Sequence, residues 1–185
     1  MKLNPAEFIF VIDWSGSMEG NSIKVAVDAM RLFIRSLPLG SKFNIVSFGS
    51  EFSSLFSANA DYTKENVNIA LEFMKTIKAD LGGTEILEPL KHIFTTSKTD
   101  TGLSKQVYLL TDGQISNEEG VLNLITENSD KFTVHSFGIG SGVSTQLIIK
   151  SAENGHGEHY FVNDHAEGLN QCVIESLRAG VDDKF

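Results

Sequence analysis

Three oxygen-bearing side chains follow the first apolar run of the chain on alternate positions. Residues 8–12 are typical of a buried strand, and Asp13, Ser15 and Ser17 come directly after them. Alternate residues of an extended backbone project to the same side, so one carboxylate and two hydroxyls can converge on one point. Hard divalent cations prefer such oxygen ligands. The spacing therefore predicts a metal site where the first strand ends.

A second carboxylate, Asp112, stands at the end of another apolar run, residues 107–111. Two neighbouring carboxylates raise each other's pKa, and a divalent cation resolves their repulsion. A third contribution is expected from Thr84, whose hydroxyl follows two glycines that let the loop approach closely. We expect the next residue, Glu85, to point outward from the start of the following helix.

Apolar runs alternate with amphipathic stretches along the whole chain, and this alternation predicts a doubly wound α/β sheet. The expected strands are residues 7–12, 42–48, 51–56, 105–111, 132–139 and 159–162. The expected helices are residues 21–37, 63–79, 85–95, 116–128, 145–152 and 166–178. Asn21 or Ser22 should cap the first helix, Ser116 should open a capping box, and Gly180 should stop the last helix.

The predicted sheet has six mostly parallel strands in the order 3-2-1-4-5-6, with helices on both faces, as in Rossmann-like folds. The Gly49-Ser50 link to the third strand is too short for a crossover, so that strand should lie antiparallel at an edge. Strands one and four are neighbours, and the chain leaves them toward opposite faces. Asp13 and Asp112 should therefore meet at the carboxyl edge of the sheet.

The chain resembles the von Willebrand factor A (vWA) domain with its metal-ion-dependent adhesion site. The resemblance covers essentially the whole chain and rests on D-x-S-x-S after strand one, Gly-Gly-Thr before a mid-chain helix and T-D-G after strand four. Residues 43–49 and 82–86 look most like the vWA domains of inter-α-trypsin inhibitor heavy chains and the vault-associated poly(ADP-ribose) polymerase. Carried over by position, the metal ligands that the resemblance implies are Asp13, Ser15, Ser17, Thr84 and Asp112.

The resemblance implies a non-enzymatic, metal-dependent protein-interaction domain that serves adhesion or assembly. In the family, the metal keeps one coordination position open for an Asp or Glu side chain of a protein partner. Mg²⁺ fits this ligand set best, and Mn²⁺ or Ca²⁺ can replace it, whereas zinc would want nitrogen or sulfur ligands. Trp14 lies between two ligands, and it should either contact the partner at the rim or pack against the loop.

Composition excludes several classes of protein. With 185 residues and 41% hydrophobic side chains, we expect one globular vWA domain, residues 1–185, cut from a larger multidomain protein. A net charge of −9 argues against a nucleic-acid or anionic-membrane surface, and no apolar run is long enough for membrane insertion. The single cysteine, Cys172, and the lack of a sequon or signal peptide favour an intracellular location. The sequence does not predict the oligomeric state.

Three alternatives fit the sequence less well. Asp13 could be the nucleophile of a Mg²⁺-dependent hydrolase or phosphotransferase, although Ser15 stands where such enzymes need a second acid. The glycine-rich turn 138–142 could bind a nucleotide, but it lacks the rest of the dinucleotide fingerprint. A transition-metal site is the third alternative, and its spacing matches no strong ligand pattern. Its candidate residues are His156, His159, His165, Glu158 and Asp164.

Overall fold

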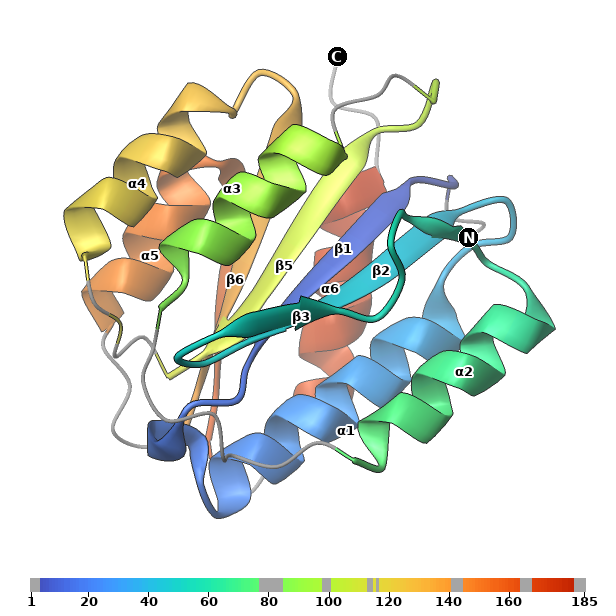
Figure 1. Cartoon of the computed structure of the whole chain (residues 1–185), viewed down its shortest axis with the longest axis horizontal. Helices are drawn as coiled ribbons and strands as arrows, with labels where there is room; N and C mark the ends of the chain where they lie inside the picture. The colour runs from blue at the N-terminus through green and yellow to red at the C-terminus, as the bar shows by residue number, and fades with distance from the viewer. Residues whose placement is uncertain are drawn as a thin grey trace.

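The computed structural model describes residues 4–76, 85–97, 101–112, 115, 117–140, 145–163 and 168–181 of the chain. These residues form one mostly parallel sheet of seven strands, covered by helices on both faces (Figure 1). Along the sheet the order is β3-β2-β1-β5-β6-β7, and β4 pairs with β2. The strands are β1 (Glu7–Asp13), β2 (Lys42–Phe48), β3 (Phe52–Ser54), β4 (Ala60–Asp61), β5 (Lys105–Thr111), β6 (Phe132–Ile139) and β7 (His156–Val162).

Helices α1, α2 and α6 cover one face of the sheet, and α3, α4 and α5 cover the other (Figure 1). Their bounds are α1 (Asn21–Ser36), α2 (Lys64–Met74), α3 (Leu87–Thr96), α4 (Glu118–Glu127), α5 (Thr145–Asn154) and α6 (Leu169–Val181). A short 3-10 helix, η1 (Gly16–Met18), connects β1 to α1. Among the helices of the described ranges, none is both long and apolar enough to cross a bilayer.

The central strand β1 is apolar between its two terminal acids because it packs against helices on both sides. Its seven residues are all buried. Phe8 and Phe10 belong to the core beneath α1, α2 and α6, whereas Ile9 and Val11 belong to the core beneath α3 and α4. Such two-sided burial is typical of parallel sheets. It places the residue at the carboxyl end of β1, Asp13, at the middle of the sheet edge.

The strand register confirms that β1 and β5 end side by side. The two strands pair in parallel, with Ile12 opposite Leu110. After β1 the chain turns through η1 into α1 on one face, and after β5 it continues to α4 on the other face. The carboxyl ends of these strands therefore form a topological switch point, where α/β sheets bind ligands.

The strands at the sheet edges differ from the sequence-based prediction. The antiparallel edge strand is confirmed, but β3 covers fewer residues than the predicted 51–56. Phe56 instead pairs with the side chain of Asn44, whose amide group exchanges two hydrogen bonds with its backbone. The two-residue strand β4 was not predicted, because it is too short to show an alternating pattern. β7 begins at His156 rather than at residue 159, and a shift in its register with β6 lies between His156 and His159.

The helix ends also differ in places. Gly20, at φ 89°, precedes α1 without a side-chain cap, so the predicted cap at Asn21 or Ser22 was wrong. Asn117 caps α4 by accepting a hydrogen bond from the Gly120 amide, while Ser116, the predicted cap, lies outside the described residues. α2 ends at Met74 rather than at residue 79, and residues 77–79 are not described. Gly180 lies inside α6 and does not stop it.

Candidate metal centre

Asp13 is the buried hub of the candidate site. It ends β1 with no exposed surface. Its Oδ1 accepts hydrogen bonds from the amide and the hydroxyl of Ser15, at 2.8 and 2.5 Å. Its Oδ2 accepts one from the hydroxyl of Thr111, at 2.6 Å. The turn into η1 folds Ser15 back over the end of the strand, which is how a residue two positions later reaches the same carboxylate.

Asp112 supplies a second buried carboxylate beside Asp13. It directly follows β5 and is 4% exposed. Burial raises the pKa of Asp13, the hydrogen bonds from Ser15 and Thr111 work in the opposite direction, and the charge of Asp112 raises the pKa further. The two acids, 99 positions apart by their numbers, therefore feel each other's charge. The structure brings together Asp13, Ser15 and Asp112, and their role as metal ligands stays a prediction.

The other two predicted ligands are only partly covered by the structure. Ser17 lies within η1, but its side chain is not among those described. Thr84 lies outside the described residues. The amide of Glu85 donates a hydrogen bond of 2.8 Å to the carbonyl of Gly49, which directly follows β2. The chain just after Thr84 therefore reaches the same edge of the sheet, and Glu85 itself is exposed, as expected.

Trp14 packs against the body of the protein rather than standing free at the rim. Its amide donates to the carbonyl of Phe48, at 2.7 Å, and its ring stacks on Phe73 of α2 with centroids 5.6 Å apart. The side chain is partly buried and belongs to the core beneath α1 and α2. The structure therefore shows packing rather than exposure at the rim, but the ring packs on α2 and not on the loop.

Thr111 belongs to the T-D-G motif but was not among the predicted site residues. This residue is fully buried at the end of β5, and its hydroxyl binds the carboxylate of Asp13 across the two strands. Ile12 lies opposite Leu110, so the next residues along the parallel pair are Asp13 and Thr111. Because both strands are buried from end to end, their apolar patterns do not fix this alignment, and the sequence alone does not reveal the contact.

A sequence model of the von Willebrand factor type A domain matches residues 6–161 of the chain. The chain belongs to this family. von Willebrand factor A domain-containing protein 5A of Rattus norvegicus is 41% identical over 190 residues, which cover 96% of this chain and 23% of that protein. A vWA domain-containing protein of Dictyostelium discoideum is 38% identical over 162 residues, covering 88% of this chain and 17% of its own length. The chain thus spans about a fifth of the curated relatives it matches.

Solved structures share the fold of this vWA domain. Proximal thread matrix protein 1 from the mussel byssus, with a zinc-occupied MIDAS motif, superposes with a TM-score of 0.77 at 18% identity, over 95% of this chain and 46% of that one. von Willebrand factor type A from Catenulispora acidiphila superposes with a TM-score of 0.78 at 21% identity, over 94% of this chain and 43% of that one. These likenesses confirm the doubly wound fold. The finer resemblance to inter-α-trypsin inhibitor heavy chains stays a prediction.

The donors of the vWA site fit a hard divalent cation. They are carboxylate and hydroxyl oxygens, which Mg²⁺ and Mn²⁺ prefer. In the described part of the chain, the partners of Asp13 are two hydroxyls and an amide, none of which carries a charge. A buried carboxylate with a raised pKa and neutral partners gains most from a cation. The described residues contain no group of three or more His, Cys, Asp or Glu side chains that could hold a metal ion, so the candidate centre depends on hydroxyls beside its two carboxylates.

The remaining predicted sites receive no support from the structure. His156 and His159 are exposed on β7 and belong to no ligand group among the described residues, while Asp164 and His165 are not described. Of the glycine-rich turn, Gly138 lies within β6, and residues 141–142 fall outside the described ranges. Cys172 is partly buried on α6, where burial and then the charge of Glu175 raise the pKa of its thiol.

Proposed function

We propose that this vWA domain is a metal-dependent protein-interaction module, which binds an Asp or Glu side chain of a partner through a Mg²⁺-type ion. The observation that carries the proposal is the meeting of two buried carboxylates, Asp13 and Asp112, with a hydroxyl at the switch point of the sheet. The zinc-occupied MIDAS motif of the mussel protein supports a metal site in this fold. An adhesion or assembly role for the longer protein follows as part of the proposal.

The hydrogen bonds assign different tasks to the site residues. The hydroxyl of Ser15 donates its hydrogen to Asp13, so a cation would meet the oxygen of this hydroxyl and not its hydrogen. Both oxygens of Asp13 already accept hydrogen bonds, which suits a carboxylate that acts through a bound water. Asp112 is then the charged direct ligand, together with the predicted Ser17 and Thr84.

This division of tasks explains why an acidic partner would bind. A divalent ion whose direct ligands are mostly hydroxyls keeps net positive charge. When bound, the ion supplies an open coordination position that a carboxylate can fill. Glu85, the acid next to the predicted ligand Thr84, is exposed in the described part of the chain. Mg²⁺ fits best, and Mn²⁺ or Ca²⁺ are the alternatives.

The enzymatic alternative has no comparable observation in its favour. A nucleophilic carboxylate must present an oxygen to the substrate. Asp13 has no exposed surface, and each of its oxygens is engaged by Ser15 or Thr111. Neither of the relatives described above carries the name of an enzyme.

Metal binding is tested first with Mg²⁺ alone. We expect Mg²⁺ to raise the unfolding temperature of the wild-type chain, and EDTA to reverse the rise. Asp13→Ala and Asp112→Ala should fold but lose this response. Asp130→Ala is the matched control, because Asp130 is an exposed acid just before the amino end of β6, at the opposite edge of the sheet. An unchanged response to Mg²⁺ in both site variants would contradict the assignment.

Partner binding needs a separate measurement. An immobilised peptide that carries several Asp and Glu residues should retain the wild-type chain and the Asp130→Ala variant in Mg²⁺. Retention should disappear in EDTA and in Asp112→Ala, because the peptide carboxylate then has no ion to bind. Equal retention with and without EDTA would show that the surface, and not a metal, binds the peptide.

A further inference from the structure

Thr111 connects the two strands that carry the candidate metal centre. Its side chain is fully buried at the end of β5, and its hydroxyl donates a hydrogen bond of 2.6 Å to Oδ2 of Asp13 at the end of β1. Ser15 binds the other oxygen, Oδ1, through its amide and hydroxyl. The carboxylate of Asp13 is therefore held on both oxygens, from two elements that are far apart in the sequence.

The contact has two geometric consequences. A carboxylate held at Oδ1 alone can still rotate about its side-chain bonds, whereas donors on both oxygens restrict it to one orientation. This orientation is the one in which Asp13 receives the hydrogen of Ser15 Oγ. The same bond ties the end of β5 to the end of β1, so the next residue, Asp112, leaves the sheet from a restrained position.

We propose that Thr111 is a positioning residue of the metal centre, which acts on the ion only through Asp13 and Asp112. The inference rests on the metal site of the proposed function and goes beyond its predicted ligands. The partners that orient metal ligands typically matter almost as much as the ligands, and their loss lowers metal affinity by about 10- to 100-fold. The hydroxyl of Thr111 is such a partner, whereas its methyl group serves the packing of the strand.

Two substitutions separate the hydroxyl from the methyl group. Thr111→Val keeps the branched shape that strands favour but removes the donor. Thr111→Ser keeps the donor and removes the methyl. Titration calorimetry should show that Thr111→Val binds Mg²⁺ about 10- to 100-fold more weakly than wild type, whereas Thr111→Ser stays within about threefold. Thr133→Val is the matched control, because Thr133 lies on β6 toward the amino edge of the sheet.

A purely structural role would move other quantities. The unfolding temperature in EDTA reports the fold without metal, and it should fall no more for Thr111→Val than for Thr111→Ser. If Thr111→Val does not fold, Thr111→Ala replaces it in the same comparison with Thr111→Ser.

The outcomes distinguish this inference from the proposed function. Wild-type affinity in Thr111→Val, or an equal loss in Thr111→Ser, would overturn the positioning role and leave the metal site intact. A wild-type chain that binds no Mg²⁺ would overturn the proposed function itself, and the inference with it. Weak binding in Thr111→Val with recovery in Thr111→Ser supports both.

Discussion

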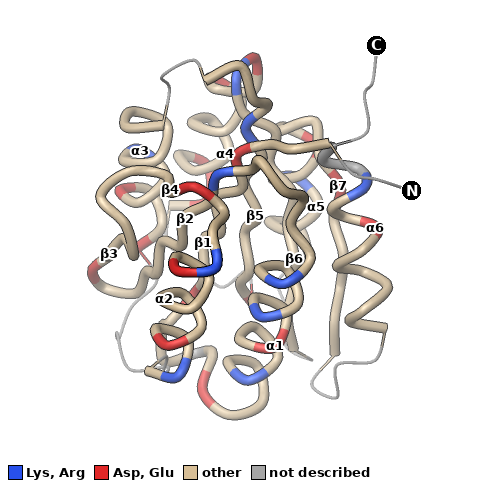
Figure 2. Tube along the Cα trace, turned by 90° about the vertical axis from the view of Figure 1, so that its right-hand side faces the viewer, with Lys and Arg blue, Asp and Glu red and all other residues tan. Residues whose placement is uncertain are grey.

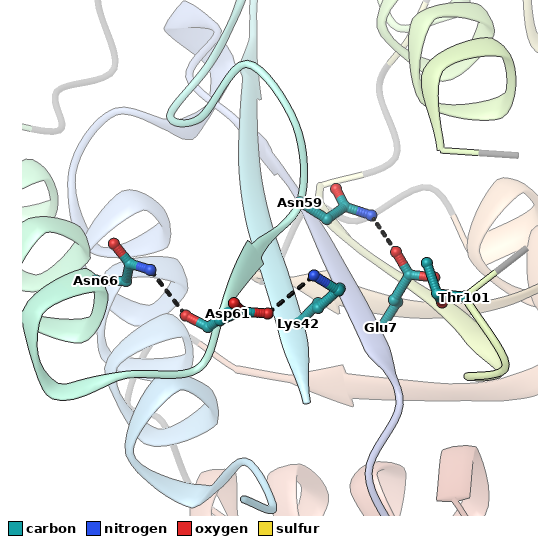
Figure 3. A network of polar contacts seen from close by, with 6 residues as sticks. All are labelled: Glu7, Lys42, Asn59, Asp61, Asn66 and Thr101. Atoms are coloured by element: carbon teal, nitrogen blue, oxygen red, sulfur yellow. Dashed lines mark hydrogen bonds and ion pairs between the residues drawn. The ribbon is translucent and has the colours of Figure 1, made fainter. Parts of the chain in front are cut away.

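The first and last residues of β1 are both buried acids, yet their surroundings differ. At the amino end, Glu7 accepts hydrogen bonds from Lys105 at 2.6 Å, Thr101 at 2.7 Å and Asn59 at 2.9 Å; Figure 3 shows the latter two partners. At the carboxyl end, the partners of Asp13 in the described residues are neutral. Among the described residues, Glu7 thus has a positively charged partner and Asp13 has none.

The pKa values of the two carboxyl groups express this difference. Burial alone would raise the pKa of Glu7, but the hydrogen bonds from Lys105, Asn59 and Thr101 and the charge of Lys105 outweigh it, and the pKa is lowered. Burial raises the pKa of Asp13, and its neutral donors do not offset the rise. Burial is therefore not what distinguishes the two ends. At the amino end, the chain itself supplies the cation that Glu7 needs, whereas the carboxyl end is suited to a cation from solution.

The largest expected effect comes from removing the internal cation. Lys105 and Glu7 are 7% and 3% exposed, so Lys105→Met leaves a buried carboxylate without its positive partner. Loss of one member of a buried pair costs about 3–5 kcal/mol, and we expect a fall of this size in the free energy of unfolding, measured with urea. The double variant Glu7→Gln/Lys105→Met should recover much of it. A loss below about 1 kcal/mol would mean that water screens the pair.

The next largest effect is the stabilisation by Mg²⁺, which should depend on the carboxyl end of β1 and not on the amino end. At about a hundred times its dissociation constant, Mg²⁺ should stabilise the protein by about 2.7 kcal/mol. The double variant Glu7→Gln/Lys105→Met should keep this gain, because the length of β1 separates Glu7 from Asp13 by about 20 Å. Asp13→Ala should lose the gain. Thermal unfolding with and without Mg²⁺ measures this stabilisation. If the amino-end variant also lost the stabilisation, the two ends would not be independent.

A smaller effect appears in the pH dependence of the metal-free protein, with opposite signs at the two ends. The pKa of Glu7 lies below 4.5 when folded, so its stabilisation is complete above 4.5 and is lost as the pH falls through the lowered value. The pKa of Asp13 lies above 3.8 when folded, so the folded chain binds a proton more tightly than the unfolded chain does. Stability therefore falls as the pH rises from 3.8 through the raised pKa.

Unfolding in urea between about pH 3 and pH 7, with EDTA present, measures both slopes. Glu7→Gln should remove the stability that depends on an ionised Glu7 and flatten the loss toward acid. Asp13→Asn should remove the opposite slope. If both substitutions changed the slope of the unfolding free energy against pH in the same direction, relative to wild type, the contrast between the two ends would be wrong.

The smallest effect is expected at an exposed ion pair beside the buried one. The Nζ atom of Lys42, at the start of β2, lies 2.8 Å from Oδ1 of Asp61 (Figure 3), and the side chain of Asp61 is 70% exposed. Exposed pairs contribute little, so Asp61→Asn should change the free energy of unfolding by less than about 0.5 kcal/mol. A change as large as that of Lys105→Met would show that burial is not what makes the amino-end pair important.

Much of the fold and the centre of the site could be predicted because both follow from local pattern plus topology. The apolar run that ends at Asp13 indicates a central strand, and the switch-point rule then places Asp112 beside it. No contact between the two acids had to be assumed. The short strand β4 and the Gly20 turn could not be predicted, since neither carries a periodic pattern.

The partners of the two acids were the harder part. Lys105 meets Glu7, and Thr111 meets Asp13, across 98 positions in each case. Such contacts depend on the register between β1 and β5, which the composition of either strand does not specify. Both strands are buried from end to end, so their apolar patterns alone allow more than one alignment.

Trp14 is the single tryptophan of the chain, and it sits between Asp13 and Ser15 with its ring on Phe73. The intrinsic fluorescence of these 185 residues therefore comes mainly from the loop that holds the candidate ion. Any shift of this loop against α2 changes the surroundings of the indole and hence its emission. The protein carries a built-in optical probe of its own binding edge, without a label or an added tryptophan.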